Sequence, residues 1–200
     1  MSGVPESAWP VKVGVQLPGP PEDLGGWLAD AAAFDAAGAD ALWVEFPSDA
    51  RLDPLAVTAA LTTLTFRSLL VAPLPESPTG QQAQGRTLAT IARLSQGRLA
   101  LHCARAQLAE ASRTDEDWPG LEIFCRLDDG GFERTRVGAE PERWARTPSP
   151  DGRVAWREAI GGAAERGVGG LLVPAEPRLL DILRNPDSGD DRRDLQLAQG

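Results

Sequence analysis

The residues best suited to chemistry gather in one stretch of the chain, Gly97-Arg98-Leu99-Ala100-Leu101-His102-Cys103-Ala104-Arg105. His102 is the single histidine, Cys103 is one of two cysteines, and Arg105 follows two residues later. An imidazole moves protons near neutral pH, a thiol can act as a nucleophile, and a guanidinium binds phosphate through parallel hydrogen bonds. In α/β sheets, chemistry lies just beyond the carboxyl ends of strands. We therefore expect a functional site at the end of the strand predicted over 99–103.

The same three residues also have structural interpretations. Successive strand residues point to opposite faces, so one of His102 and Cys103 is expected to face the interior. A buried histidine is often a hydrogen-bonded structural residue, and a buried cysteine packs as a small apolar group. Arg105 is equally compatible with a solvated position on a loop. Both interpretations stay open from the residues alone.

Strand-like and helix-like segments alternate through the first half of the chain. Apolar runs predict strands over 11–17, 41–45, 67–72 and 99–103, and helical spacing predicts helices over 24–34, 53–65 and 82–95. Asp53 followed by Pro54 is typical of an N-cap and a first helical position. Such alternation predicts a parallel sheet with right-handed crossovers, and strands that are apolar throughout fit a sheet covered on both faces.

The second half of the chain is less regular. The turn signal Asp128-Asp129-Gly130-Gly131 separates two strand-like segments, which predicts a hairpin. Its strands cover 121–127 and 132–137, and they are followed by a loop over 139–151, a helix over 154–166, a strand over 170–174 and a helix over 177–184. We expect an N-terminal extension over 1–10, a single domain over 11–185 and a polar tail over 186–200.

Composition excludes several classes of function. The 29 acidic against 20 basic residues give a net charge of -9, which opposes binding to nucleic acids and to anionic membranes. Two cysteines and one histidine do not suggest a disulfide framework or a metal centre, so no metal is expected. No apolar run approaches the roughly 20 residues of a membrane span. The first ten residues lack the features of a signal peptide, and we expect a cytoplasmic protein.

Several segments resemble, in order, those of the luciferase-like monooxygenases, a family that includes bacterial luciferases, alkanesulfonate monooxygenases and deazaflavin-dependent reductases. They are VGVQLP (13–18), AGADALWVE (37–45), DPLAVTAALTTLT (53–65), LATIARLSQGRLAL (88–101) and RGVGGLLVP (166–174). The most specific is the string Leu-Ser-x-Gly-Arg between a helix and a strand. The resemblance covers residues 11–105 and 153–185.

The resemblance implies a (β/α)₈ barrel that binds flavin or deazaflavin at the carboxyl ends of its strands. A full barrel takes about 250 residues, whereas here only about 65 residues separate the fourth strand from the final helix and strand. We therefore expect an α/β fold, a reduced or incomplete TIM-like barrel with mostly parallel strands, shortened between strand 4 and the last strand. The non-fluorescent flavoprotein branch of the family is similarly reduced.

The resemblance also implies roles for particular residues. Arg105 falls where luciferases place an arginine on the flavin phosphate. Ala72-Pro73 matches a dipeptide that they hold in cis beneath the flavin ring, so we hypothesise a cis bond here, against the alternative of an ordinary trans proline. Further candidates for cofactor contact are Gln16, at the end of the first strand, and Cys103. His102 is a candidate catalytic residue.

Two departures from the family pattern bear on these roles. Many members carry a histidine just after Leu-Trp-Val, where this chain has Glu45-Phe46-Pro47. A buried Glu45 is a candidate to replace that histidine in proton transfer, and the alternative is a plain polar residue at a strand end. The family also prefers glycines after strand 4, whereas the larger side chains of this chain would crowd a cofactor there.

Two functions follow from the resemblance and stay open. The first is a flavin-dependent oxidoreductase of the luciferase-like monooxygenase type, using FMN or a deazaflavin coenzyme to oxygenate or reduce a small organic substrate. The alternative is a non-catalytic flavin-binding protein or partner subunit derived from that family. The resemblance further implies a homodimer through the helices 53–65 and 82–95, the first of which is apolar over a wide arc.

Overall fold

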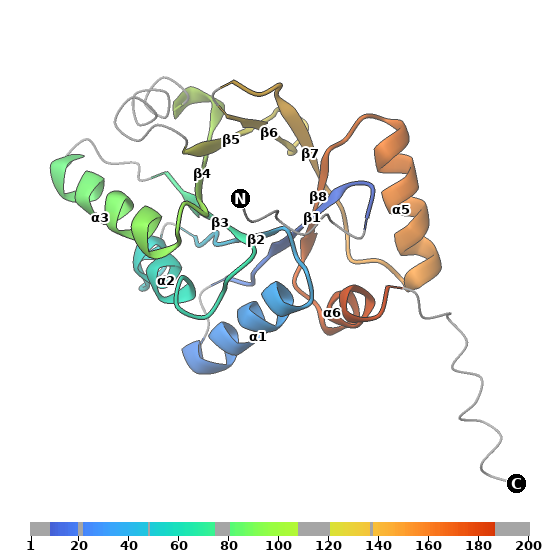
Figure 1. Ribbon diagram of the computed structural model, residues 1–200, viewed down its shortest axis with the longest axis horizontal. Helices are drawn as coiled ribbons and strands as arrows, with labels where there is room; N and C mark the ends of the chain where they lie inside the picture. The colour runs from blue at the N-terminus through green and yellow to red at the C-terminus, as the bar shows by residue number, and fades with distance from the viewer. Residues whose placement is uncertain are drawn as a thin grey trace, which may run out of the picture.

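The computed structural model describes residues 9–19, 22–47, 49–74, 81–107, 121–136 and 138–186, which form a closed barrel with the strand order β1 to β8 (Figure 1). The strands are β1 (Lys12–Gln16), β2 (Ala41–Trp43), β3 (Leu69–Pro73), β4 (Leu99–Cys103), β5 (Glu122–Arg126), β6 (Phe132–Thr135), β7 (Glu142–Arg146) and β8 (Gly170–Pro174). The helices are α1 (Leu24–Ala36), α2 (Pro54–Leu61), α3 (Gln81–Leu94), α5 (Arg153–Glu165) and α6 (Pro177–Arg184), with a 3₁₀ turn at Arg105–Gln107. Most of the predicted extension and tail lies outside the described residues.

The predicted α/β barrel with mostly parallel strands is confirmed, and the barrel is closed rather than incomplete. β6 runs antiparallel to both β5 and β7, whereas the other neighbouring strands pair in parallel, including β8 with β1. Parallel neighbours need a crossover of a dozen or more residues, but antiparallel neighbours can be joined by a tight turn. The chain is therefore shorter because no crossover helix is needed between β5, β6 and β7, while all eight strands that close the barrel are present.

One prediction for this region was wrong, because the stretch 139–151 contains β7 and is not simply a loop. Glu142 and Arg146 point into the polar ends of the barrel and Arg143 is exposed, so only Trp144 of this strand is fully buried. The strand therefore lacks the apolar run by which its neighbours are recognised. The predicted hairpin between β5 and β6 is confirmed, with Gly130 at φ 82° in its turn.

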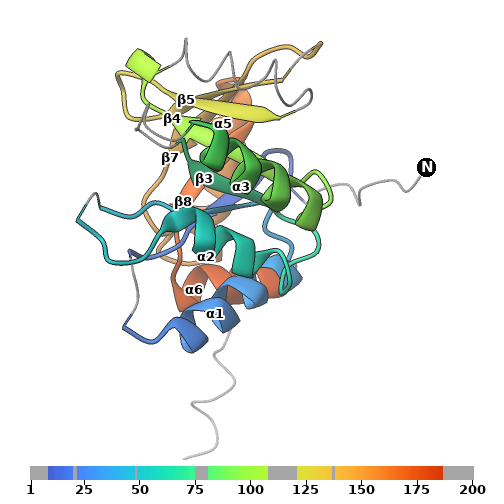
Figure 2. The same ribbon diagram turned by 90° about the vertical axis from the view of Figure 1, so that its left-hand side faces the viewer.

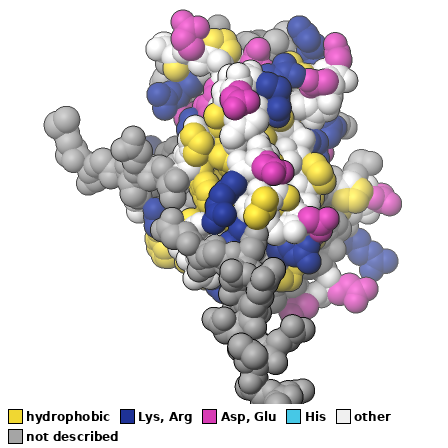
Figure 3. Space-filling view, turned by 90° about the vertical axis from the view of Figure 1, so that its right-hand side faces the viewer, with side chains coloured by type: hydrophobic (Ala, Val, Ile, Leu, Met, Phe, Trp, Pro, Cys, Tyr) yellow, Lys and Arg dark blue, Asp and Glu magenta, His cyan; other side chains and the backbone are white. Residues whose placement is uncertain are grey.

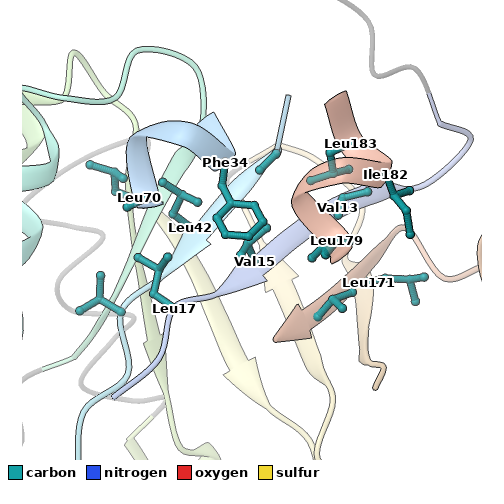
Figure 4. Close-up of a cluster of buried hydrophobic side chains, with 14 of the residues drawn as sticks. Val13, Val15, Leu17, Phe34, Leu42, Leu70, Leu171, Leu179, Ile182 and Leu183 are labelled. Atoms are coloured by element: carbon teal, nitrogen blue, oxygen red, sulfur yellow. The ribbon is translucent and has the colours of Figure 1, made fainter. Parts of the chain in front are cut away.

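An apolar layer fills the space between the parallel strands and the helices around them (Figure 4). Val13, Val15 and Leu42 project outward from the barrel and meet Phe34 of α1. On the neighbouring strand β8, Leu171 lies against α6, which contributes Leu179, Ile182 and Leu183. Burial of a side chain of this size stabilises the fold by about 1.5–3 kcal/mol. By contrast, the outward side chain of Glu133 on β6 is exposed and needs no covering helix.

The Gly-Arg string after α3 has a structural explanation at the amino-terminal end of the barrel. Gly97 has a φ of 82°, which reverses the chain, and the guanidinium of Arg98 donates to the carbonyl oxygens of Thr65 (2.7 Å) and Ser68 (2.8 Å). The carboxylate of Asp35 accepts hydrogen bonds from the three backbone N–H groups that come directly after Thr65, the last of them that of Ser68 at 2.7 Å. These contacts hold the loop between α2 and β3, away from the strand ends where chemistry is expected.

The helices expected to form a homodimer, α2 and α3, lie side by side on one flank of the barrel (Figure 2). Leu64, Phe66 and Leu94 are exposed near their carboxyl ends. The dimer stays a prediction. On another flank, shown in Figure 3, acidic, basic and apolar side chains are interspersed without a patch of one sign. None of the helices in the described ranges has the length and apolar character of a transmembrane span.

Candidate functional site

The barrel interior is divided into layers by a central group of aromatic side chains. Trp43, Phe124, Phe132 and Trp144 are almost inaccessible to solvent and pack against one another, with ring centroids 4.5–6.4 Å apart. A Cβ atom on Gly170 would lie 2.4 Å from the ring of Trp144, so glycine is required there by close approach. We call these four rings the aromatic plug. The plug separates one polar layer at each end of the barrel.

The polar layer at the amino-terminal end is a network of ion pairs, which we call the basal layer. Arg134 lies 2.6 Å from Glu122 and 2.8 Å from Glu142, and Lys12 lies 2.7 Å from Glu142. Arg136 pairs more loosely with Glu122, at 3.5 Å. A cavity of about 90 Å³ borders this network and is also lined by Ala139 and Glu140. In barrels of this kind, the amino-terminal end serves stability, and catalysis takes place at the other end.

At the carboxyl-terminal end, Glu45 lies at the centre of a second polar layer, which we call the mouth cluster. Its carboxylate accepts from Arg146 Nη2 at 2.8 Å, Arg126 Nη2 at 3.3 Å and Gln16 Nε2 at 3.1 Å. Arg146 Nη1 also donates to Gln16 Oε1 at 2.8 Å. Both guanidinium groups lie over the ring of Phe132, at 5.3 Å for Arg146 and 5.7 Å for Arg126. The cluster thus joins the ends of β1, β2, β5 and β7.

His102 adds a half-buried imidazole to the mouth cluster. Its ring stacks on Trp43, with centroids 5.6 Å apart, and meets Phe132 edge-on. Among the described residues, its Nε2 atom has no hydrogen-bond partner. Burial lowers the pKa of His102, as do the charges of Arg126 and Arg146, against the opposing effects of Glu45 and the backbone of Val44. The imidazole is therefore neutral at pH 7.

Glu45 is ionised and held as a counterion in this arrangement. Burial acts to raise the pKa of Glu45, but the hydrogen bond and charge of Arg146, with further electrostatic contributions from His102 in its protonated form and from Arg126, outweigh burial and hold that pKa below its ordinary value. A carboxylate held in this way is a poor proton acceptor. The mouth cluster contains two arginines for one carboxylate, within a chain of net charge -9. Such a local excess of positive charge favours an anionic ligand.

The structure brings together some of the residues predicted from sequence. Gln16, Glu45 and His102 meet at the mouth, and Pro73 pairs with His102 in the sheet. Arg105 is exposed on the 3₁₀ turn just beyond β4, at the same end of the barrel. Ala72 points outward, away from the barrel interior. The roles assigned to these residues stay predictions.

Two sequence expectations for this region change with the structure. The peptide bond between Ala72 and Pro73 is trans, so the hypothesis of a cis bond was wrong; β3 continues through Pro73 as regular extended strand. Cys103 also points outward and is the register partner of Cys125 on β5. Burial, together with the neighbouring Cys125, raises the pKa of Cys103 to about 12. Its thiol is therefore directed away from the mouth cluster.

Sequence reasoning did not identify the two arginines of the mouth cluster. Arg126 ends an apolar segment on the same alternating face as Phe124, a pattern that marks an inward polar residue at a strand end. Arg146 lies in the strand that was predicted as loop, so no pattern pointed to it. Within the described ranges, no group of three or more His, Cys, Asp or Glu side chains is arranged to hold a metal ion.

Comparisons with known proteins support the fold. No family model and no curated protein matches the sequence. Two crystal structures of tryptophan synthase from M. tuberculosis match with a TM-score of 0.53 each, at 16% and 17% identity, over 87% of this chain and 90% of theirs. At such identity the likeness shows the barrel alone.

A further structure matches more weakly. It is the oxygenating constituent of 3,6-diketocamphane monooxygenase from Pseudomonas putida, a type II Baeyer-Villiger monooxygenase in complex with FMN. Its TM-score is 0.41 at 14% identity, over 81% of this chain and 57% of that one. A match of this strength supports no statement about function. The chain is thus similar to solved proteins at the level of a closed, mostly parallel eight-stranded barrel.

Proposed function

We propose that the mouth cluster binds the phosphate of a flavin, either FMN or a deazaflavin coenzyme, and that the protein is a luciferase-like flavin-dependent oxidoreductase acting on a small organic substrate. The observation that carries this proposal is the pair of guanidinium groups, Arg126 and Arg146, shared by a single carboxylate at the carboxyl-terminal end of the barrel. That end is where barrels of this kind bind their ligands. Arginine forks match phosphate oxygens through paired hydrogen bonds.

The mouth residues fit the phosphate of such a cofactor. Arg146 Nε is buried without a hydrogen-bond partner among the described residues, so a donor is available for an added anion. Arg105, exposed at the same end, is a further phosphate ligand in the proposal. The aromatic plug fills the barrel beneath, so the ring system belongs above the mouth cluster and not inside the barrel.

The protein's own contribution to a reaction follows from the same residues. The bound flavin supplies the redox chemistry. The aromatic plug excludes water from below, and the buried Nε2 atom of the neutral His102 imidazole accepts a proton in the proposed reaction. Before a ligand binds, Glu45 holds both arginines at the mouth through its two carboxylate oxygens.

A non-catalytic flavin-binding protein or partner subunit is the second candidate. It is favoured by the state of Glu45, which occupies the place of the family's histidine but is engaged by two arginines. Because its carboxylate is ionised and paired, it lacks the raised pKa of a general base. On this alternative, flavin binds at the mouth cluster without turnover.

Titration with FMN and with a deazaflavin coenzyme tests the proposal directly. We expect a dissociation constant below about 100 μM, which corresponds to roughly -5.5 kcal/mol. Arg146→Gln should weaken binding by about tenfold or more, because a charge-assisted hydrogen bond contributes about 1.5–3 kcal/mol. Arg105→Ala, measured alongside, reports whether the exposed arginine also contacts the phosphate.

Arg143→Gln is the matched control for Arg146→Gln. Arg143 lies on the same strand, but it is exposed and pairs with Asp129 outside the mouth cluster, so its loss should leave flavin affinity unchanged. Absence of affinity for either flavin would contradict the proposal, as would equal effects of the two substitutions. If flavin binds, oxygen consumption with the reduced cofactor, compared with that of the same concentration of free reduced flavin, separates the enzyme from the non-catalytic alternative.

A further inference from the structure

We infer that Glu45 is an internal competitor for the ligand, and that a phosphate monoester takes the place of its carboxylate between Arg126 and Arg146. This inference rests on the proposed function only in requiring that the mouth cluster bind a phosphate; it does not require a flavin ring. It names the chemical class that the site selects and gives Glu45 a role in that selection.

The position of Glu45 is the first argument. Glu45 follows β2, whereas Arg126 and Arg146 end β5 and β7, so the carboxylate joins strands that are not neighbours in the barrel. One oxygen accepts from Arg126 at 3.3 Å, and the other accepts from Arg146 at 2.8 Å. The carboxylate thus occupies the place that is most favourable for an anion at this end of the barrel.

The donors that Glu45 leaves unused are the second argument. A guanidinium carries five N–H donors, and one carboxylate accepts only a few of those that two arginines offer. Arg146 Nε is buried and has no hydrogen-bond partner among the described residues. The side chain of Arg126 is 48% exposed and is therefore accessible to a ligand from solvent. The arginines can accordingly bind an anion with more acceptor oxygens than a carboxylate has.

A phosphate monoester has the properties needed to displace Glu45. It carries a charge of about -1.5 to -2 near pH 7 and three acceptor oxygens, against one charge and two oxygens for a carboxylate. A ligand carboxylate would offer the arginines nothing that Glu45 lacks, and it would also lose translational freedom on binding. The cluster therefore discriminates against simple carboxylates because one is already built in.

Displacement also changes what Glu45 can do. The hydrogen bond and charge of Arg146 are what hold the pKa of Glu45 low against the opposing effect of burial. Once a phosphate occupies the arginines, Glu45 loses much of this stabilisation while staying close to the neutral imidazole of His102. Ligand binding thereby converts a paired counterion into a proton acceptor at the site.

The test measures binding of inorganic phosphate by calorimetry at constant ionic strength. Glu45→Gln should bind phosphate at least about tenfold more tightly than the unmodified protein, a change of about 1.4 kcal/mol. Glu45→Asp, whose shorter side chain cannot reach both arginines as well, should bind with intermediate affinity. Arg146→Gln should lose the binding. Circular dichroism of each variant confirms that it is folded.

Glu133→Gln is the matched control, because it removes the same charge from an exposed position on β6. It should leave phosphate affinity unchanged, which separates local competition from the effect of net charge. Unchanged or weaker binding by folded Glu45→Gln and Glu45→Asp overturns the inference, and it leaves the proposed function standing if FMN binding still depends on Arg146. Tighter phosphate binding without affinity for any flavin supports the inference and overturns the flavin proposal.

Discussion

The two ends of the barrel interior are built from the same residue types, arginine and glutamate, on opposite sides of the aromatic plug. In the basal layer, Lys12, Arg134 and Arg136 pair with the carboxylates of Glu122 and Glu142, and all three cations border one small cavity. In the mouth cluster, Arg126 and Arg146 share the single carboxylate of Glu45. Each network therefore has one more cation than carboxylate, but the central arginine of the basal layer is the more buried: the side chain of Arg134 is 15% exposed, against 31% for Arg146.

The two ends also differ in how completely their polar atoms are satisfied. Among the described residues, the buried polar side-chain atoms without partners include His102 Nε2 and Arg146 Nε, both at the mouth, and none from the basal layer. Buried polar groups are normally paired, so exceptions call for an explanation. The comparison shows that the buried polar side-chain atoms described for the basal layer all have partners, whereas two of those in the mouth cluster do not, and it is the mouth cluster that we propose binds a ligand.

Substitution of one arginine at each end should give the largest difference. Arg134→Met should lower the free energy of unfolding by about 3 kcal/mol, because it removes the more buried of the two arginines and leaves the buried carboxylate of Glu122 without its closest partner. Arg146→Met should cost less than about 1 kcal/mol, since its ion pair with Glu45 is partly exposed and Arg126 remains. Urea denaturation at pH 7 measures both.

The same pair of variants should show the opposite order in ligand binding. Phosphate affinity should fall with Arg146→Met and stay the same with Arg134→Met in the folded state. Similar losses of stability at the two ends would show that the mouth cluster is also a structural network, and the distinction between the layers would not hold.

Glu45 should contribute to the loss of folding stability in acid, and this effect should be smaller than those of the arginine substitutions. Its pKa is lower in the folded protein than its ordinary value of 4.5, so the ionised form stabilises the fold above that value. This stabilisation is lost as the pH falls from 4.5 through the folded pKa. Glu45→Gln should therefore decline in stability less steeply below pH 4.5 than the unmodified protein, as measured by thermal unfolding between pH 3 and 6.

Asp35 provides the background for that measurement. Burial acts to raise its pKa, but hydrogen bonds from Ser68, Phe66 and Arg67 hold it below its ordinary value, so Asp35 also loses stabilising charge in acid. Because Asp35 is present in both proteins, only the difference between their curves reports on Glu45. Parallel curves would mean that the arginines do not stabilise its ionised form.

Substitution of Cys103 should have the smallest effect on ligand binding, although Cys103 is the neighbour of His102 in the sequence. Its side chain points into the outer apolar layer, so Cys103→Ala should leave phosphate and flavin affinity unchanged. With a pKa raised from 9.0 to about 12, its thiolate is about a thousandfold scarcer at pH 8 than that of an ordinary thiol. In a Cys125→Ala background, Cys103 should therefore react very slowly with a thiol reagent, and rapid modification would contradict its place in the outer apolar layer.

Local signals made much of the fold predictable. The predicted N-cap at Asp53 is confirmed, with its carboxylate accepting from the N–H of Leu55 at 2.7 Å. The turn at Gly130 and the reversal at Gly97 are likewise properties of a few adjacent residues. Where the local signal was weak, as in β7, the strand was missed, because two of its polar side chains, Glu142 and Arg146, pair with Lys12 and Glu45, which are distant in the sequence.

The sequence by itself determined the alternation of strands and helices, the hairpin and the helix caps, because hydrophobic periodicity and turn chemistry act over a few residues. It also placed Gln16, Glu45 and His102 at strand ends. Only the tertiary structure decided that the barrel closes and that Glu45 meets Arg126 and Arg146, which lie 81 and 101 positions away. The physical reason is that closure and strand register bring distant strand ends together, and no local pattern encodes which polar side chains meet there.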